Sequence, residues 1–363
     1  MIVNLKAKAL YNKIFEGTET WVANKILVFQ KRRELRKYVK HLPKLTSEQK
    51  KAVREFWKPY CRVKMDWFRF YAGITGKFDP RYIPEDLLHT KIDQYFNQKK
   101  LGYGFNDKNN YSLIFPGIKQ PKTIVRKIGS LLFDEEYHLI DIGKAMALLA
   151  MCPEVIVKPT QETGGGRYIK FYDTKSDAER LKQLLLDKKS KNWIVQDLVK
   201  QHYEMAKMHP QSLNTVRVFT ILLDDGVHIL SSGMRMGANS SRIDNISANS
   251  GICAGVKETG ELLTCAFYGL LSKESTDKHP QGTPLSEIKV PFFDKILETA
   301  KRAAQFTGHF RFVGWDFAVD EGGNIVLIEA NMRKADTIAF QRWFGPLYGD
   351  LTEKVLNEVF GRE

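Results

Sequence analysis

The segments GWDFAV (residues 314–319) and IVLIEAN (residues 325–331) flank a Gly-Gly turn near the C-terminus, a pattern that predicts a β-hairpin. Asp316 then lies on one strand, while Glu329 and Asn331, two positions apart, share one face of the other. A carboxylate directly after an apolar run is costly unless it is paired or bound to a metal. The three side chains therefore predict a Mg²⁺ site that phosphates and water complete. The alternative is a surface hairpin with ordinary polar residues.

A second stretch, VKPTQETGGGR (residues 157–167), combines a lysine at the end of an apolar strand with three consecutive glycines. Lys158 can project from the strand end as a point charge on phosphate. Gly164, Gly165 and Gly166 can turn their backbone N–H groups together toward an anion, because they carry no side chains. A glycine triplet alone is more often a simple turn. Neither a P-loop nor a dinucleotide-binding glycine fingerprint is present.

From about residue 105 onward the chain has the pattern of an α+β fold with largely antiparallel sheets, because short β-rich runs alternate with turn signals. The expected strands are residues 155–157, 168–171, 193–195, 216–222, 228–230, 317–319 and 325–328, and the expected helices are residues 176–186, capped by Ser176, and 288–306. The preceding region is basic and mainly helical, with helices expected after the N-cap Thr46 and from Pro84. We therefore expect two domains, residues 1–104 and 105–363.

Positive charge is concentrated in the N-terminal quarter of the chain. Residues 1–100 hold 23 Lys and Arg against 10 Asp and Glu, and the net charge of all 363 residues is +14. Such a block predicts an anionic partner, or else a solvated basic surface without one. Residues 21–42 have the pattern of a cationic amphipathic helix, which either lies on anionic lipid or packs its apolar stripe on the protein. Nucleic acid is the less expected partner.

The composition is that of an ordinary globular protein, with 43% hydrophobic and 27% charged residues. No apolar run approaches the roughly 20 residues that are needed to cross a bilayer. The N-terminal residues lack the apolar centre and small-residue cleavage site of a signal peptide. We therefore expect a cytoplasmic protein, with peripheral contact at the inner membrane face as the alternative.

Taken together, these motifs resemble those of the ATP-grasp superfamily over about residues 105–363. The family pattern has a lysine ahead of a central domain, a strand ending in Lys-Pro before a glycine loop, an adenine-binding hinge strand and a C-terminal Asp with Glu-x-Asn. The resemblance implies an ATP-grasp fold with a central lid subdomain, about residues 121–200, and a C-terminal metal-binding subdomain, about residues 201–363. It implies that ATP is bound by Lys108, Lys158, Gly164, Gly165, Gly166, Gln196, Asp197, Leu198 and Glu204, and Mg²⁺ or Mn²⁺ by Asp316, Glu329 and Asn331.

A narrower resemblance is to the sugar-transfer-associated ATP-grasp proteins, and it rests on HPQSLNTVRV (residues 209–218), RIDN (residues 242–245) and GICAGV (residues 251–256). That group is associated with exopolysaccharide and capsule synthesis. The resemblance implies a ligase that joins a carboxylate to an amine through an acyl phosphate, with sugar-linked or amino-acid substrates. Guanidinium groups pair bidentately with oxyanions. The groups that would hold the transferred phosphate or the substrate are therefore Arg217, Arg235 and Arg242. Asn245, in a loop rich in Ser and Gly, would orient the substrate or merely form a turn.

Two departures from the family pattern bear on the mechanism. Ser250 stands where related ligases often have the first of two glycines, and Gly314 stands two residues before Asp316, where an arginine is expected. The group that stabilises the tetrahedral intermediate is therefore left open. Two other functions also stay open at this point: an ATP-dependent phosphotransferase on the same fold, and a nucleotide-binding adaptor that docks on membrane through its basic N-terminal region.

Overall fold

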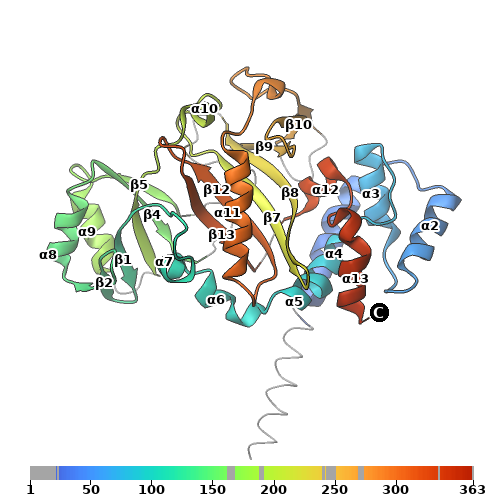
Figure 1. Ribbon diagram of the computed structural model, residues 1–363, viewed down its shortest axis with the longest axis horizontal. Coiled ribbons are helices and arrows are strands. Elements are labelled where there is room, and N and C mark those ends of the chain that lie inside the picture. Colours follow the sequence, from blue (N-terminus) through green and yellow to red (C-terminus); the bar gives the residue numbers. More distant parts are fainter. Residues whose placement is uncertain are drawn as a thin grey trace, which may run out of the picture. The chain divides into compact units, whose positions relative to one another are not determined.

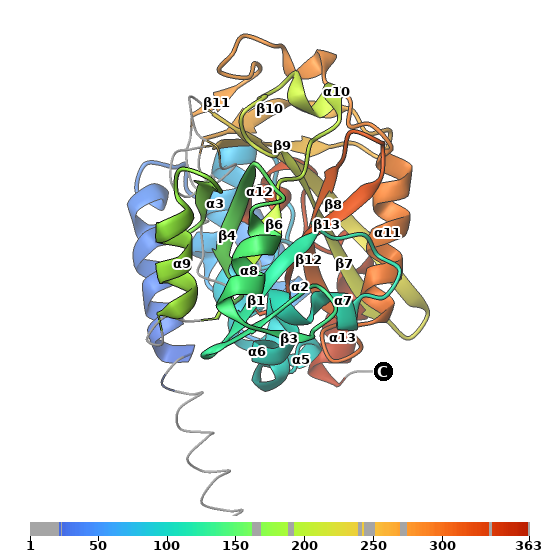
Figure 2. The same ribbon diagram turned by 90° about the vertical axis from the view of Figure 1, so that its left-hand side faces the viewer.

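The computed structural model describes residues 22, 24–161, 168–187, 192–238, 242, 251–268, 274–333 and 336–361 (Figures 1 and 2). The chain forms two compact units, one of residues 1–95 with residues 337–363 and the other of residues 96–336. The predicted division at residue 104 stays a prediction. Among the described residues, no helix is both long enough and apolar enough to cross a bilayer.

The first unit is helical, as predicted for the N-terminal region. Helix α2 begins at the predicted cap, where the Thr46 hydroxyl accepts a hydrogen bond from the Gln49 amide and the Gln49 side chain accepts one from the Thr46 amide. The C-terminal helix α12 belongs to this unit because the buried Gln341 side chain bonds to the backbone of Ile83 and to the Tyr71 hydroxyl. The helical segments are residues 24–39, α2 (Ser47–Trp57), α3 (Met65–Thr75), α4 (Glu85–Leu87), a π-helical turn (Leu88–Ile92), α5 (Asp93–Phe96), α12 (Ile338–Phe344), a 3₁₀ turn (Gly349–Leu351) and α13 (Thr352–Phe360).

The second unit contains two antiparallel sheets, which confirms the predicted α+β class. The six-stranded sheet has the order β3-β2-β1-β6-β4-β5, and α8 and α9 cover one of its faces (Figure 1). Val157 and Val195 lie in one buried cluster with Leu149 and Leu181 of these helices, so Lys158 lies on the opposite face. The elements are β1 (Thr123–Ile128), β2 (Leu131–Phe133), β3 (Leu139–Ile140), α8 (Ile142–Leu149), β4 (Glu154–Pro159), β5 (Lys170–Asp173), α9 (Ala178–Leu186) and β6 (Trp193–Asp197).

The seven-stranded sheet has the order β11-β10-β9-β8-β7-β12-β13 and includes the predicted C-terminal hairpin as β12 and β13. Helix α11 packs on one face, where Ile296 and Ala300 share a buried cluster with Val218, Trp315 and Phe317. The strands are β7 (Thr215–Leu223), β8 (Gly226–Gly237), β9 (Gly251–Val256), β10 (Leu262–Phe267), β11 (Ser275–Thr276), β12 (Phe312–Val319) and β13 (Ile325–Asn331). The other segments of the unit are 3₁₀ turns at Lys99–Leu101, Lys108–Asn110 and Leu285–Glu287, and helices α6 (Gly102–Phe105), α7 (Tyr111–Ile114), α10 (Tyr203–Ala206) and α11 (Phe293–Gln305).

Two predicted helix starts are wrong. Helix α9 begins at Ala178, because the amide and hydroxyl of Ser176 donate to the Asp173 carboxylate in the preceding turn instead of capping the helix. Helix α11 begins at Phe293 because the residue before it, Phe292, has a left-handed backbone conformation (φ 53°), which interrupts a right-handed helix.

Candidate active site

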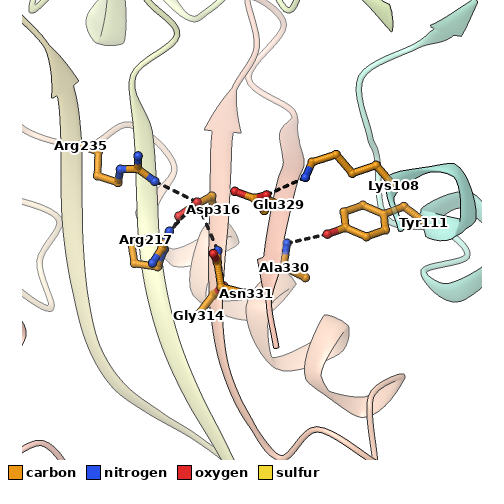
Figure 3. Close-up of polar contacts among 9 residues, drawn as sticks. All are labelled: Lys108, Tyr111, Arg217, Arg235, Gly314, Asp316, Glu329, Ala330 and Asn331. Carbon is orange, nitrogen blue, oxygen red and sulfur yellow. Dashed lines mark hydrogen bonds and ion pairs between the residues drawn. The ribbon is translucent and has the colours of Figure 1, made fainter. Parts of the chain in front are cut away.

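One face of the seven-stranded sheet carries the three predicted metal ligands. Asp316 of β12 lies opposite Glu329 of β13 on one side and opposite Arg217 of β7 on the other. The alternate residues of these strands are buried against α11, so the charged side chains project from the opposite face (Figure 3). We call this surface the polar face and define it by Arg217, Arg235, Asp316, Glu329 and Asn331.

Asp316 is held by two arginines. Arg217 donates two hydrogen bonds to its carboxylate, one of them from Nη2 to Oδ2 at 2.7 Å, and Arg235 donates from Nη1 to Oδ2 at 3.1 Å (Figure 3). The Asp316 side chain is only 3% exposed. Burial acts to lower the pKa of Arg217, but the Asp316 carboxylate outweighs burial and the pKa is raised. The buried carboxylate is therefore compensated by guanidinium groups, and the Asn331 amide lies 3.5 Å from it.

Glu329 pairs with the first predicted lysine. The distance from Lys108 Nζ to Glu329 Oε1 is 2.6 Å. Burial acts to raise the pKa of Glu329, but Lys108 and the two arginines of the polar face lower it to about 2. The backbone amide of Lys108 donates to the Thr160 carbonyl at 2.8 Å. This hydrogen bond ties the Lys108 turn to the end of β4, where the second predicted lysine lies.

Lys158 is 7% exposed at the end of β4. Its pKa is lowered to about 7 by burial and by repulsion from Lys108, while Glu329 acts in the opposite direction. Both predicted phosphate-binding lysines therefore interact electrostatically with the Glu329 carboxylate. Four cationic side chains and two carboxylates gather here, so the group as a whole favours an anionic ligand. They are Lys108, Lys158, Arg217, Arg235, Asp316 and Glu329.

Several buried polar atoms beside Lys108 and Lys158 lack hydrogen-bond partners, which bears on whether a nucleotide fits here. Within the described residues, the Thr160 hydroxyl, the Gln196 carbonyl oxygen and both polar side-chain atoms of Asn109 have no hydrogen-bond partner. Each of these residues is at most 5% exposed. Leaving such a group unsatisfied costs about 1–3 kcal/mol, so their position beside Lys108 and Lys158 indicates a polar ligand. The residues present thus fit ATP, and the oxygen atoms of the three predicted metal ligands fit Mg²⁺.

The predicted hinge strand is β6, which pairs with β4. The Gln196 side-chain amide donates to the Pro121 carbonyl at 3.2 Å and to the Thr123 hydroxyl at 3.4 Å. These bonds orient the amide group so that its oxygen is the atom left to accept. The Leu198 amide donates to the Asp197 carboxylate at 2.8 Å, so these two predicted residues also bond to each other. Their contact with adenine stays a prediction.

Not every predicted residue lies at the polar face. Arg242 forms two hydrogen bonds with Glu154 of β4 and stacks on Phe171, 3.8 Å from the ring centre. Glu204 accepts a hydrogen bond from Lys207 at 2.8 Å and lines a cavity of about 470 Å³ together with residues 258–259 and 289–294. The roles predicted for these two residues stay predictions. Four predicted residues lie outside the described part of the chain: Gly164, Gly165, Gly166 and Asn245.

Three residues beside the site were not predicted from the sequence. The Tyr111 hydroxyl accepts a hydrogen bond from a backbone amide of β13 at 3.0 Å (Figure 3). Thr160 follows Lys158 by two positions, and this strand-like spacing is a signal that could have identified it. The position of Asn109 is fixed by its backbone carbonyl, which accepts a hydrogen bond from the Arg126 side chain of β1 at 3.0 Å. That contact joins distant segments, so no local pattern reveals it.

The profile of a known family covers the site. The description "sugar-transfer associated ATP-grasp" belongs to a family whose profile matches residues 88–342, more than half of the 363 residues. The matched range contains both lysines and the whole polar face. The chain belongs to the sugar-transfer associated ATP-grasp family. No curated protein sequence matches this ATP-grasp chain.

Solved structures of ATP-grasp ligases are similar to this family member at low identity. The ligase PsnB in complex with a minimal precursor is 15% identical, with 72% of this chain and 64% of that chain covered and a TM-score of 0.42. The VanG D-Ala:D-Ser ligase from Enterococcus faecalis is 15% identical (70% and 61% covered, TM-score 0.42). An L-amino acid ligase from Bacillus licheniformis is 12% identical (70% and 47% covered, TM-score 0.40). The chain thus spans less than two thirds of the length of each.

Gly314 makes room for Arg217 in this ATP-grasp site. A Cβ atom added to Gly314 would lie 2.8 Å from Phe219 Cε1 and 3.2 Å from Arg217 Cδ. We expect Gly314→Ala to lower the free energy of unfolding by about 1–3 kcal/mol, because the buried neighbours must shift. Urea denaturation measures this change. The matched control is Gly308→Ala, where the added atom meets nothing within 4 Å, and equal losses in the two variants would contradict the prediction.

The buried Lys158 predicts a pH-dependent stability. Its pKa of about 7 in the folded protein is below the ordinary value of 10.5, so its destabilising effect is complete below pH 7 and fades as the pH rises toward 10.5. We expect Lys158→Met to exceed the wild type in unfolding free energy by up to about 5 kcal/mol at pH 6 and by less than about 1 kcal/mol at pH 10. Urea denaturation across this range is the test, with the exposed Lys182→Met as control. The prediction is contradicted if the difference in unfolding free energy between Lys158→Met and the wild type stays the same as the pH rises from 6 to 10.

Proposed function

We propose that this ATP-grasp protein is an ATP- and Mg²⁺-dependent ligase that joins a carboxylate to an amine through an acyl phosphate. The proposal depends chiefly on one observation, the gathering of four cations and two carboxylates at the polar face and beside it. Lysine and arginine bind phosphate oxygens, and carboxylates are hard ligands for Mg²⁺. Mn²⁺ accepts the same oxygen ligands and is the alternative metal.

The proposed roles follow from where the side chains lie. Lys108 and Lys158 bind phosphate oxygens of ATP. Asp316, Glu329 and Asn331 would hold Mg²⁺, which would neutralise the charge on the transferred phosphoryl group. The family pattern, rather than a contact in this structure, supports the remaining roles: the glycines at 164–166 close over the phosphates, Gln196, Asp197 and Leu198 hold adenine, and Glu204 holds the ribose.

Arg217 and Arg235 are the proposed oxyanion-binding groups, because both guanidinium groups lie at Asp316 and Arg217 uses only Nε and Nη2 to bond to that carboxylate. Its other N–H groups would bind the oxyanion. A substrate carboxylate oxygen attacks the γ-phosphorus of ATP and ADP leaves. The amine nitrogen then attacks the acyl carbon and loses a proton, and phosphate departs with one of the original carboxylate oxygens. Two guanidinium groups beside the acyl carbon would stabilise the negative charge of the tetrahedral intermediate. Arg242 and Asn245 are proposed to contact the substrate further from the reacting atoms.

The substrates we propose are sugar-linked or amino-acid carboxylates and amines used in surface polysaccharide synthesis. The description of the family supports the link to sugar transfer, and the paired arginines support the carboxylate. Because the reaction consumes ATP, we place the protein in the cytoplasm. An ATP-dependent phosphotransferase would use the same lysines and metal ligands, and it differs in the fate of the phosphoryl group.

An ¹⁸O-labelled carboxylate distinguishes the two reactions. Uronic acids and amino acids, labelled in the carboxylate, are incubated with the protein, ATP, Mg²⁺ and a set of amines. We expect inorganic phosphate that carries one ¹⁸O atom and forms only when both co-substrates are present. ADP without free phosphate, together with a stable phosphorylated acceptor, would show a phosphotransferase and overturn the ligase proposal.

The same assay tests the arginine assignment. Arg217→Lys keeps the charge but loses the guanidinium N–H groups that would bind the oxyanion, so we expect kcat to fall roughly 10²–10³-fold, as for loss of an oxyanion donor. Arg180→Lys on the exposed surface of α9 is the matched control and should keep the wild-type kcat. A kcat for Arg217→Lys equal to that of this control would remove Arg217 from the mechanism.

A further inference from the structure

The helix at residues 24–39 packs one side on its own unit. Leu35 and Val39 on that side are 2% and 4% exposed. Arg32 reaches the same side and pairs with Asp86 at 2.8 Å. These contacts establish which side of the helix faces the protein and which side is presented outward.

The outward side carries apolar residues. Val22, Ile26 and Phe29 are 45%, 53% and 64% exposed. They follow one another at spacings of four and three positions, so they form one stripe along the helix, which is the blue helix after the grey trace in Figure 2. Single exposed apolar side chains are common, but a contiguous stripe of them marks an interaction surface.

Basic residues follow the apolar stripe on the same side of the helix. Arg33 lies four positions after Phe29 on the helix, so it projects from the outward side, and Lys40 is exposed directly after the helix ends. Arg36 and Lys37 are exposed beside them. In the described part of the chain, none of these four cations takes part in a salt bridge. We call this surface the docking face and define it by Val22, Ile26, Phe29, Arg33, Arg36, Lys37 and Lys40.

We propose that the docking face binds an anionic lipid surface. Its apolar residues enter the boundary between headgroups and acyl chains, and its basic residues pair with the lipid phosphates. A membrane satisfies both halves of the face at once, whereas the phosphates of a nucleic acid would leave the apolar half in water. The basic balance of residues 1–100, 23 Lys and Arg against 10 Asp and Glu, adds attraction of the same sign. The proposal is independent of the ligase assignment, since it uses no residue of the polar face.

Co-sedimentation of the full chain with vesicles tests the proposal. We expect binding to phosphatidylcholine vesicles that contain phosphatidylglycerol, weaker binding at high salt, and none to phosphatidylcholine alone. Arg33→Glu/Lys37→Glu should lower the vesicle affinity at least about 25-fold, since each basic residue near the surface is worth about fivefold. Ile26→Ser/Phe29→Ser should lower it as well without changing the net charge. Circular dichroism and the urea midpoint confirm that each variant is folded.

The matched control is Lys182→Glu/Lys301→Glu, which makes the same change in net charge on exposed residues of α9 and α11. It should keep most of the affinity. Equal losses in both charge-reversal variants would show a general charge effect and overturn the docking face.

Tryptophan fluorescence tests whether the apolar residues of the docking face enter the bilayer. Phe29→Trp should show a blue shift of its added emission with phosphatidylglycerol vesicles, because the ring leaves water. No shift, or binding to DNA but not to vesicles, would likewise overturn the proposal.

Discussion

Compensation of buried charge at the polar face is the constraint on which the rest of the structure depends. Asp316 is almost fully buried, and an unpaired carboxylate in such a place would be strongly destabilising. Arg217 and Arg235 pair with it, and Lys108 pairs with Glu329. These contacts join β7, β8, the C-terminal hairpin and the turn before α7. The same charges that a nucleotide and its metal would engage therefore also compensate one another.

The antiparallel architecture makes this compensation possible. Register places Arg217, Asp316 and Glu329 side by side on three adjacent strands, while the alternate residues are buried against α11. The hydrogen bond from the Lys108 amide to the Thr160 carbonyl links this face to the six-stranded sheet, from which Lys158 comes. Each sheet thus buries its helix-covered face and contributes charged residues from the other. The candidate site lies where the alternation of the strands leaves polar side chains on the faces away from these helices.

Much of the site could be predicted from the sequence because its signals are local. Two-residue spacing predicted that Glu329 and Asn331 share one face, and an apolar run ending in lysine predicted that Lys158 lies at a strand end. Their roles in binding stay predictions. The pairing of Arg217 with Asp316 could not be predicted, because it depends on the order of strands that are 99 positions apart in the chain.

Where the helices begin and which unit they join was decided by the conformation and contacts of single residues. Helix α11 starts late because of the left-handed Phe292, and α12 joins the N-terminal helices through the buried Gln341. Neither feature follows from helical spacing, because each depends on a single residue whose conformation or partner is set by the folded chain. The spacing of apolar residues therefore predicted which helices and strands exist more accurately than it predicted their first residues.

Calorimetric titration of ATP into the wild type and Glu329→Gln, with and without Mg²⁺, tests the central claim most directly. The claim is that the polar face and the two lysines form one site for ATP with its metal. The account predicts that Mg²⁺ strengthens ATP binding to the wild type, and that Glu329→Gln loses this gain while the exposed Glu321→Gln keeps it. Equal ATP affinity with and without Mg²⁺ in the wild type, or an unchanged gain in Glu329→Gln, would contradict it.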